Sequence, residues 1–203
     1  MSSCLGVACA LALVCMSYLA PVAQAQDTPK VEVFAGYSYM PLKGPDGHGL
    51  NVSVTTNLNH RVGLTADFSG HFGTGRFSSQ TTGFSDPSRG NIRLYNLFYG
   101  PRLMIGNRGR ATVFGHSLFG LSHSFAQTFP PPSQPQLPIE FSGTGFGMAL
   151  GGTLDIELNS RLALRPIRAD YLFSRFVGRN HHDFRYSGGI VIRLGRLRPP
   201  ARP

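Results

Sequence analysis

Alternation of apolar and polar side chains, in segments that recur along the chain, constrains this sequence more than any other feature. In RVGLTADFSGHF, residues 61–72, most apolar residues share one parity and most polar residues share the other. Successive side chains of a β-strand point to opposite faces, so the segment predicts a strand with one apolar and one polar face. The apolar face turns inward in a soluble barrel or sandwich. In a membrane barrel it turns outward to lipid, and polar side chains line the interior.

Eight segments of this kind follow one another, at 31–39, 50–58, 61–72, 92–105, 112–123, 146–158, 162–174 and 184–195. Their lengths suit tilted transmembrane strands, which need about 9–11 residues, and none has a helical period. Short links at 59–60, 106–110 and 159–160 alternate with longer ones at 40–49, 73–91, 124–145 and 175–183. Trimmed turns at one rim and loops at the other are typical of up-and-down membrane barrels, whereas Greek-key sandwiches do not sort their connections in this way. The sequence predicts an all-β, eight-stranded antiparallel up-and-down transmembrane β-barrel over residues 26–195.

The polar face of this barrel carries charges of both signs. An unpaired charge in the small lumen would cost several kcal/mol, so we expect a paired network that closes the lumen. In particular, we expect Asp155 to hold the sixth segment to Arg168 of the seventh. The predicted lumen network comprises Glu32, Asp67, Arg102, Asp155, Glu157, Arg168, Asp170, Arg185 and Arg193. The predicted lipid-facing set comprises Val62, Leu64, Phe68, Tyr95, Leu97, Tyr99, Leu150, Leu154, Ile156, Tyr171, Ile190 and Ile192. Phe34, Phe98 and Leu172 are apolar exceptions on the polar parity.

The first residues predict export. An apolar run over residues 5–19, followed by the small-residue sequence AQA at 23–25, indicates a cleaved signal peptide covering residues 1–25; an anchor helix is the alternative. All three cysteines, Cys4, Cys9 and Cys15, lie within it. The predicted mature chain therefore has no thiol for disulfides, cysteine metal sites or nucleophilic catalysis. The Arg- and Pro-rich segment 196–203 is expected to be a disordered tail.

The net charge of +9 comes largely from arginine. These arginines are scattered singly and form no basic stripe with stacking aromatic residues, which argues against nucleic-acid binding. Outer-membrane lipid, lipopolysaccharide and internal ion pairs are better uses for them. The loops at 73–91 and 124–145 are candidate contacts for an extracellular partner. The second contains PPPSQPQLP, which favours an extended polyproline conformation.

Several residues are candidates for a catalytic or metal site. His116 and Ser117 are adjacent, so a strand would point them to opposite faces, and the group Ser122, His123 and Ser124 lacks a placed carboxylate. The HHD sequence at 181–183 contains possible metal ligands, but adjacent histidines seldom reach one ion with good geometry. The sequence therefore predicts no enzyme, no cofactor and no metal. Two alternatives stay open: a soluble exported barrel that binds a small hydrophobic ligand, and an outer-membrane lipid-modifying enzyme that uses His116 or His123.

Six segments carry a family resemblance: VEVFAGYSY (31–39), LFYGPRLMIG (97–106), FGHSLFGLSHS (114–124), FGMALGGTLDIEL (146–158), RPIRADYLFSRF (165–176) and YSGGIVIRLG (186–195). The chain resembles the outer membrane protein beta-barrel domain family, the group similar to the transmembrane domain of outer membrane protein A. The resemblance implies an eight-stranded antiparallel barrel in a bacterial outer membrane, inserted by the barrel-assembly machinery. Its motifs are loose patterns of glycine, aromatic residues and alternation, and they imply a structural or surface-interaction role without specifying an activity.

Overall fold

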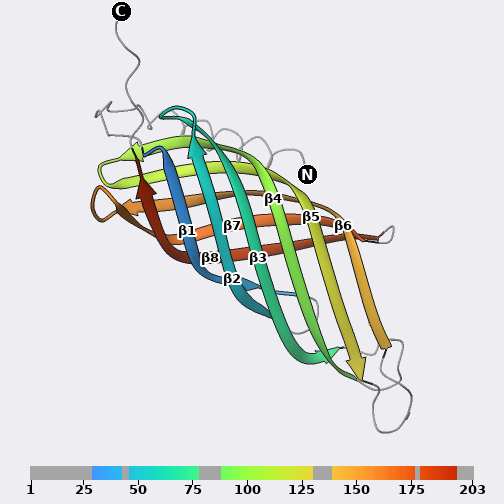
Figure 1. Cartoon of the computed structure of the whole chain (residues 1–203). Coiled ribbons are helices and arrows are strands. Elements are labelled where there is room, and N and C mark those ends of the chain that lie inside the picture. Colours follow the sequence, from blue (N-terminus) through green and yellow to red (C-terminus); the bar gives the residue numbers. More distant parts are fainter. Residues whose placement is uncertain (1–28, 43–45, 78–87, 130–138, 177–178, 196–203) are drawn as a thin grey trace, which may run out of the picture.

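A closed antiparallel barrel forms the described part of the chain (Figure 1). The computed structural model describes residues 29–42, 46–77, 88–129, 139–176 and 179–195, so the predicted signal peptide and the predicted tail lie outside the described residues. The strands are β1 Val31–Met40, β2 Gly47–Asn57, β3 Val62–Phe77, β4 Ser88–Arg108, β5 Ala111–Phe129, β6 Ile139–Glu157, β7 Leu162–Phe176 and β8 Arg179–Leu194. Each strand pairs with the next, and β8 pairs with β1. The predicted eight-stranded antiparallel barrel is confirmed.

The outside of the barrel is apolar and the inside is polar. Leu97 and Phe68 are 59 % and 48 % exposed on the outer face, whereas Asp67 and Arg185 are 1 % and 0 % exposed inside. All twelve predicted lipid-facing residues lie on this outer face, either exposed or half-buried. An apolar exterior around a charged interior suits a barrel surrounded by hydrocarbon. It also removes the premise of the soluble ligand-binding alternative, which requires an apolar interior.

Three short turns lie at one end of the barrel, here called the turn rim; the opposite end is the loop rim. In the β2–β3 turn, the Asn59 side-chain oxygen accepts hydrogen bonds from the backbone N–H groups of Arg61 and Val62, at 2.8 and 2.9 Å. Asn159 repeats this geometry in the β6–β7 turn with Arg161 and Leu162, at the same distances. Asparagine stabilises both hairpins because its side chain satisfies backbone donors that a tight turn leaves unpaired.

Strand pairing continues well beyond the predicted segments at the loop rim. The pairing of β3 with β4 reaches Phe77 and Ser88, and that of β5 with β6 reaches Thr128 and Ile139. The prediction that 73–91 and 124–145 are loops is therefore wrong for residues 73–77, 88–91, 124–129 and 139–145, which belong to β3–β6 (Figure 1). Lipid imposes alternation only at membrane depth, whereas the backbone can pair wherever two strands continue side by side. The sequence pattern fades before the strands end.

A register shift in β7 changes which side chains face the lumen. The pairing of β7 with β8 shifts between Arg165 and Arg168. These two arginines are three positions apart and would face opposite sides of a regular strand, yet both are buried inside. Pro166, which has no backbone N–H to donate, lies in the shifted segment, as expected for a β-bulge.

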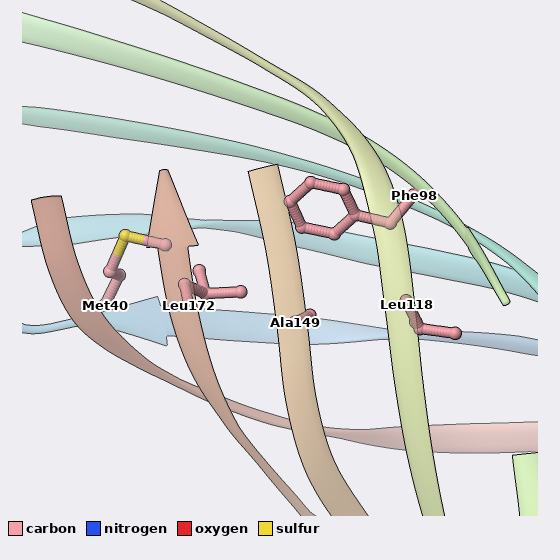
Figure 2. Packing of buried hydrophobic residues seen from close by; sticks show 5 residues of the cluster. All are labelled: Met40, Phe98, Leu118, Ala149 and Leu172. Atoms are coloured by element: carbon pink, nitrogen blue, oxygen red, sulfur yellow. The ribbon is translucent and has the colours of Figure 1, made fainter. Parts of the chain in front are cut away.

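Apolar side chains fill part of the lumen. Figure 2 shows Met40, Phe98, Leu118, Ala149 and Leu172, which point inward from five strands and form one buried cluster. A smaller cluster of Phe34, Ala163 and Val191 lies toward the turn rim. The three apolar exceptions in the sequence pattern therefore belong to lumen packing. Among the described residues, no helix is long and apolar enough to cross a membrane.

Candidate functional site

Two aspartates and two arginines form the centre of the lumen, here called the central ion cluster: Asp67, Asp170, Arg168 and Arg185. Arg168 reaches Asp67 at 2.5 Å and Asp170 at 2.8 Å. Arg185 reaches the same two carboxylates at 2.9 and 2.6 Å. Each carboxylate therefore contacts both guanidinium groups, and the cluster is electrically neutral. Pairing of this kind offsets the cost of removing four charges from water.

Neutral polar groups complete this cluster. Asn51 donates a 2.9 Å hydrogen bond to Asp67, and Arg185 donates a 2.8 Å bond to the Ser69 hydroxyl. Nε2 of His116 lies 2.6 Å from the remaining oxygen of Asp170. Side chains from β2, β3, β5, β7 and β8 therefore join across the lumen, so the cluster ties together strands that are not neighbours in the sheet.

A second set of ion pairs lies nearer the turn rim. Glu32 accepts a short hydrogen bond from Arg102, and Arg193 lies 3.7 Å from Glu32 and 3.4 Å from Glu157. Asp155 and Arg165 form a separate bidentate pair at 2.6 and 2.8 Å. All nine residues predicted for the network lie in these two regions of the lumen.

The predicted pair of Asp155 with Arg168 is wrong, because Asp155 binds Arg165 and Arg168 binds the central ion cluster. Arg165 was absent from the predicted network because a regular strand would have pointed it outward. The register shift at Pro166 reverses its direction. An arginine immediately before a proline in a strand is the one sequence signal that could have suggested a bulge here.

Arginine also packs on aromatic rings in the lumen. The guanidinium carbon of Arg102 lies 3.7 Å from the centre of the Phe114 ring, and that of Arg165 lies 4.6 Å from the Phe34 ring. Such cation–π contacts stabilise buried guanidinium groups further. In total, five carboxylates and five guanidinium groups pair in the lumen. The net charge of +9 is therefore carried by residues outside this network.

The groups weighed for catalysis do not form a hydrolase site. His116 is bound to Asp170 inside the barrel, whereas His123 lies on the outer face and bonds the Thr144 hydroxyl at 2.7 Å. A serine–histidine pair that the sequence did not suggest lies inside, with Ser38 Oγ 2.8 Å from Nε2 of His71. Nδ1 of His71 has no hydrogen-bond partner among the described residues, so no carboxylate orients the imidazole as in a catalytic triad.

The candidate metal ligands at 181–183 lie near the start of β8. Within the described ranges, no three His, Cys, Asp or Glu side chains gather where they could hold one ion. His182 instead shares a 2.5 Å hydrogen bond with the Tyr171 hydroxyl on the outer face.

At the loop rim, β3–β6 extend as a protruding sheet. β6 pairs with β5 from Ile139 onward but with β7 only from Phe146 onward. Residues 139–145 therefore have one edge that pairs with no strand in the described part of the chain. On the other side of the sheet, residues 73–77 of β3 extend past the last pair with β2, which is His48 with Phe72.

Comparison with known proteins supports the fold. The family described as outer membrane protein beta-barrel domain matches residues 7–195. No curated protein sequence matches the chain. The crystal structure of Ail, the attachment invasion locus protein of Yersinia pestis, is similar with a TM-score of 0.52 and 17 % identity, over 83 % of this chain and 99 % of that chain.

Two further solved structures agree. Ail in complex with the heparin analogue sucrose octasulfate has a TM-score of 0.51 and 17 % identity, over 81 % of this chain and 96 % of that chain. Neisserial surface protein A has a TM-score of 0.51 and 11 % identity, over 81 % and 96 % of the two chains. At these identities, the likeness shows a shared barrel fold.

Proposed function

This chain belongs to the outer membrane protein beta-barrel domain family and lies in the bacterial outer membrane; on that premise we propose that it is a non-enzymatic, non-conducting barrel that presents a protruding sheet to proteins outside the cell. The observation that carries the proposal is the unpaired edge of β6 at residues 139–145. Insertion by the barrel-assembly machinery stays a prediction.

The filled lumen supports the absence of conduction. The central ion cluster lies between two apolar clusters. On its loop-rim side, Leu118 and Leu172 are two residues beyond His116 and Asp170 along their strands. The smaller apolar cluster lies on its turn-rim side. An ion that crosses this region would have to separate buried pairs and pass an apolar layer, and each step is costly. We therefore propose that the barrel acts as a scaffold for the protruding sheet at its loop rim.

The protruding sheet supports a role in protein contact. An unpaired strand edge presents backbone N–H and C=O groups that an extended segment of another protein can bind as an added strand. Ile139 and Phe141, on one face of this edge, are 51 % and 47 % exposed. Alternate side chains of a bound strand would contact these two, so backbone pairing supplies affinity and the apolar contact adds selectivity.

The partner test begins with a phage-displayed library of random peptides, selected against the refolded barrel in detergent. Selected peptides are expected to protect amides of residues 139–145 from hydrogen exchange. Binding should fall in the double variant Ile139→Lys/Phe141→Lys and persist in the control Leu158→Lys, which changes an exposed apolar residue of the β6–β7 turn at the opposite rim. Protection elsewhere, or equal binding by the edge variant, would contradict the proposal.

Conduction is tested separately. Planar bilayers that contain the full barrel are expected to show no steady single-channel current. Regular current steps from folded, heat-modifiable protein would overturn the non-conducting part of the proposal and leave the partner test unaffected.

A further inference from the structure

Aromatic and basic side chains alternate in one row across the outer face of five strands. Strand register places Tyr39 opposite His48, His48 opposite Phe72, Phe72 opposite Arg93, and Arg93 opposite Phe125. The row, here called the belt row, therefore runs across β1–β5 perpendicular to the strands. Directly opposed residues on one face of a sheet contact one another, so each base of the row lies between two aromatic rings.

The belt row points away from the lumen. Its members have the parity opposite to the inward-facing residues on every strand, and His48, Phe72 and Arg93 are exposed. It lies toward the loop rim, beyond a part of the outer face that is largely apolar. Aromatic rings prefer this depth, where hydrocarbon gives way to lipid headgroups.

The remaining strands extend the pattern. Arg175 of β7 is opposite Phe146 of β6, and His182 of β8 is opposite Phe173 of β7. Both bases are exposed on the outer face. A base opposite an aromatic residue is thus found on the outer face of β7 and β8 as well.

The basic side chains on the outer face contact different groups from the arginines of the lumen, which pair with carboxylates. The guanidinium carbon of Arg93 lies 5.9 Å from the centre of the Phe125 ring, and His48 shares a 2.5 Å hydrogen bond with Tyr37. In the described part of the chain, no carboxylate forms an ion pair with Arg93 or Arg175. One carboxylate, Asp46, lies beside the row, just before β2, where it accepts a 2.9 Å hydrogen bond from the Tyr39 hydroxyl. The lumen network is neutral by itself, so these cations contribute to the excess positive charge.

We propose that the belt row is a binding site for the phosphate groups of the outer-leaflet glycolipid, with Arg93 as the principal phosphate ligand and His48 as a second donor. Arginine always carries its charge and can give a phosphate two parallel hydrogen bonds. The two bases are two strands apart, about 10 Å, so they can contact separate phosphates or opposite sides of one headgroup. Phe72, between them, provides an apolar surface for the lipid.

Charge complementarity at the boundary with hydrocarbon favours this occupant. A cation that faces lipid near the headgroups has few water molecules around it, so a phosphate gains more there than at a fully solvated surface. A soluble polyanion would be bound more readily by bases on the loops, which project into water. The site is separate from the edge of β6, so either proposal can fail alone.

The test measures lipid retained by the refolded full chain in native mass spectrometry. The probes are bisphosphorylated lipid A, the same lipid after removal of both phosphates, and phosphatidylglycerol. We expect Arg93→Gln to weaken retention of bisphosphorylated lipid A at least about tenfold, because one charge-assisted contact is lost. Arg93→Lys, which keeps the charge but not the bidentate geometry, should fall between the wild type and Arg93→Gln.

The matched control is Arg61→Gln, which removes an exposed arginine at the turn rim and should bind lipid A like the wild type. Heat-modifiable mobility verifies that every variant is folded. Equal retention by Arg93→Gln and the wild type, or an equal loss in Arg61→Gln, would overturn the site. If the wild type retained dephosphorylated lipid A as well as bisphosphorylated lipid A, the phosphate groups would not be the ligand. If it retained phosphatidylglycerol equally well, the site would not be specific for the glycolipid.

Discussion

The pair of Asp155 with Arg165 provides the sharpest test of the lumen architecture. Its two hydrogen bonds, at 2.6 and 2.8 Å, join side chains that are nearly inaccessible to solvent. Asp155→Leu leaves the guanidinium buried and unpaired, and Arg165→Met leaves the carboxylate in that state, so each should cost about 3–5 kcal/mol. Arg165→Met also removes the contact with the Phe34 ring, which adds about 1 kcal/mol.

The double variant removes both charges and should cost no more than either single change. The coupling energy is then about 3 kcal/mol or more. The assay is urea unfolding of barrels refolded into lipid vesicles, followed by the loss of heat-modifiable mobility. The control cycle joins Asp155→Leu to Phe98→Ala, an uncharged residue of the separate apolar cluster nearer the loop rim, and should couple by less than about 0.5 kcal/mol. Additive losses in the first cycle, or strong coupling in the control cycle, would refute the assigned pairing.

Three further predictions concern the turns, a close contact between glycines and the apolar cluster, and the same unfolding assay measures their effects on stability. Asn59→Ala and Asn159→Ala should each cost about 1 kcal/mol through two lost turn hydrogen bonds, and their effects should add because they lie in different hairpins; a markedly non-additive double variant would argue against independent turns. Gly49→Ala should cost about 1–3 kcal/mol because a Cβ there would lie 1.8 Å from the Gly70 carbonyl oxygen, whereas Gly70→Ala, whose Cβ would come no nearer than 3.4 Å to the Tyr95 ring and 3.9 Å to the Phe72 ring, should change stability far less. Phe98→Ala should cost about 3–5 kcal/mol by emptying the apolar cluster, yet bilayers should still show no current because the central ion cluster persists; current through this variant would assign the seal to the apolar cluster alone.

Much of this protein could be predicted from local sequence. Alternation in segments such as 61–72 determines which face of each strand is apolar, because the side-chain period of a strand is two wherever the strand is regular. The presence of Asp67, Asp170 and Arg185 on the polar parity was therefore sufficient to predict charges in the lumen. Asn59 and Asn159 likewise indicate their turns, because the stabilising hydrogen bonds are made within three residues.

Only the closed sheet determines which arginine in the lumen pairs with which carboxylate. Arg168 reaches Asp67, which is remote in sequence, because the curvature of the barrel brings β7 opposite β3 across the lumen. Arg165 entered the network through a bulge at Pro166, and a bulge reverses the parity on which the sequence argument depends. The belt row also depends on register, since Phe72 and Arg93 become neighbours only when β3 and β4 pair. Alternation is a local property that the sequence determines, whereas register and the contacts across the lumen depend on all eight strands closing together.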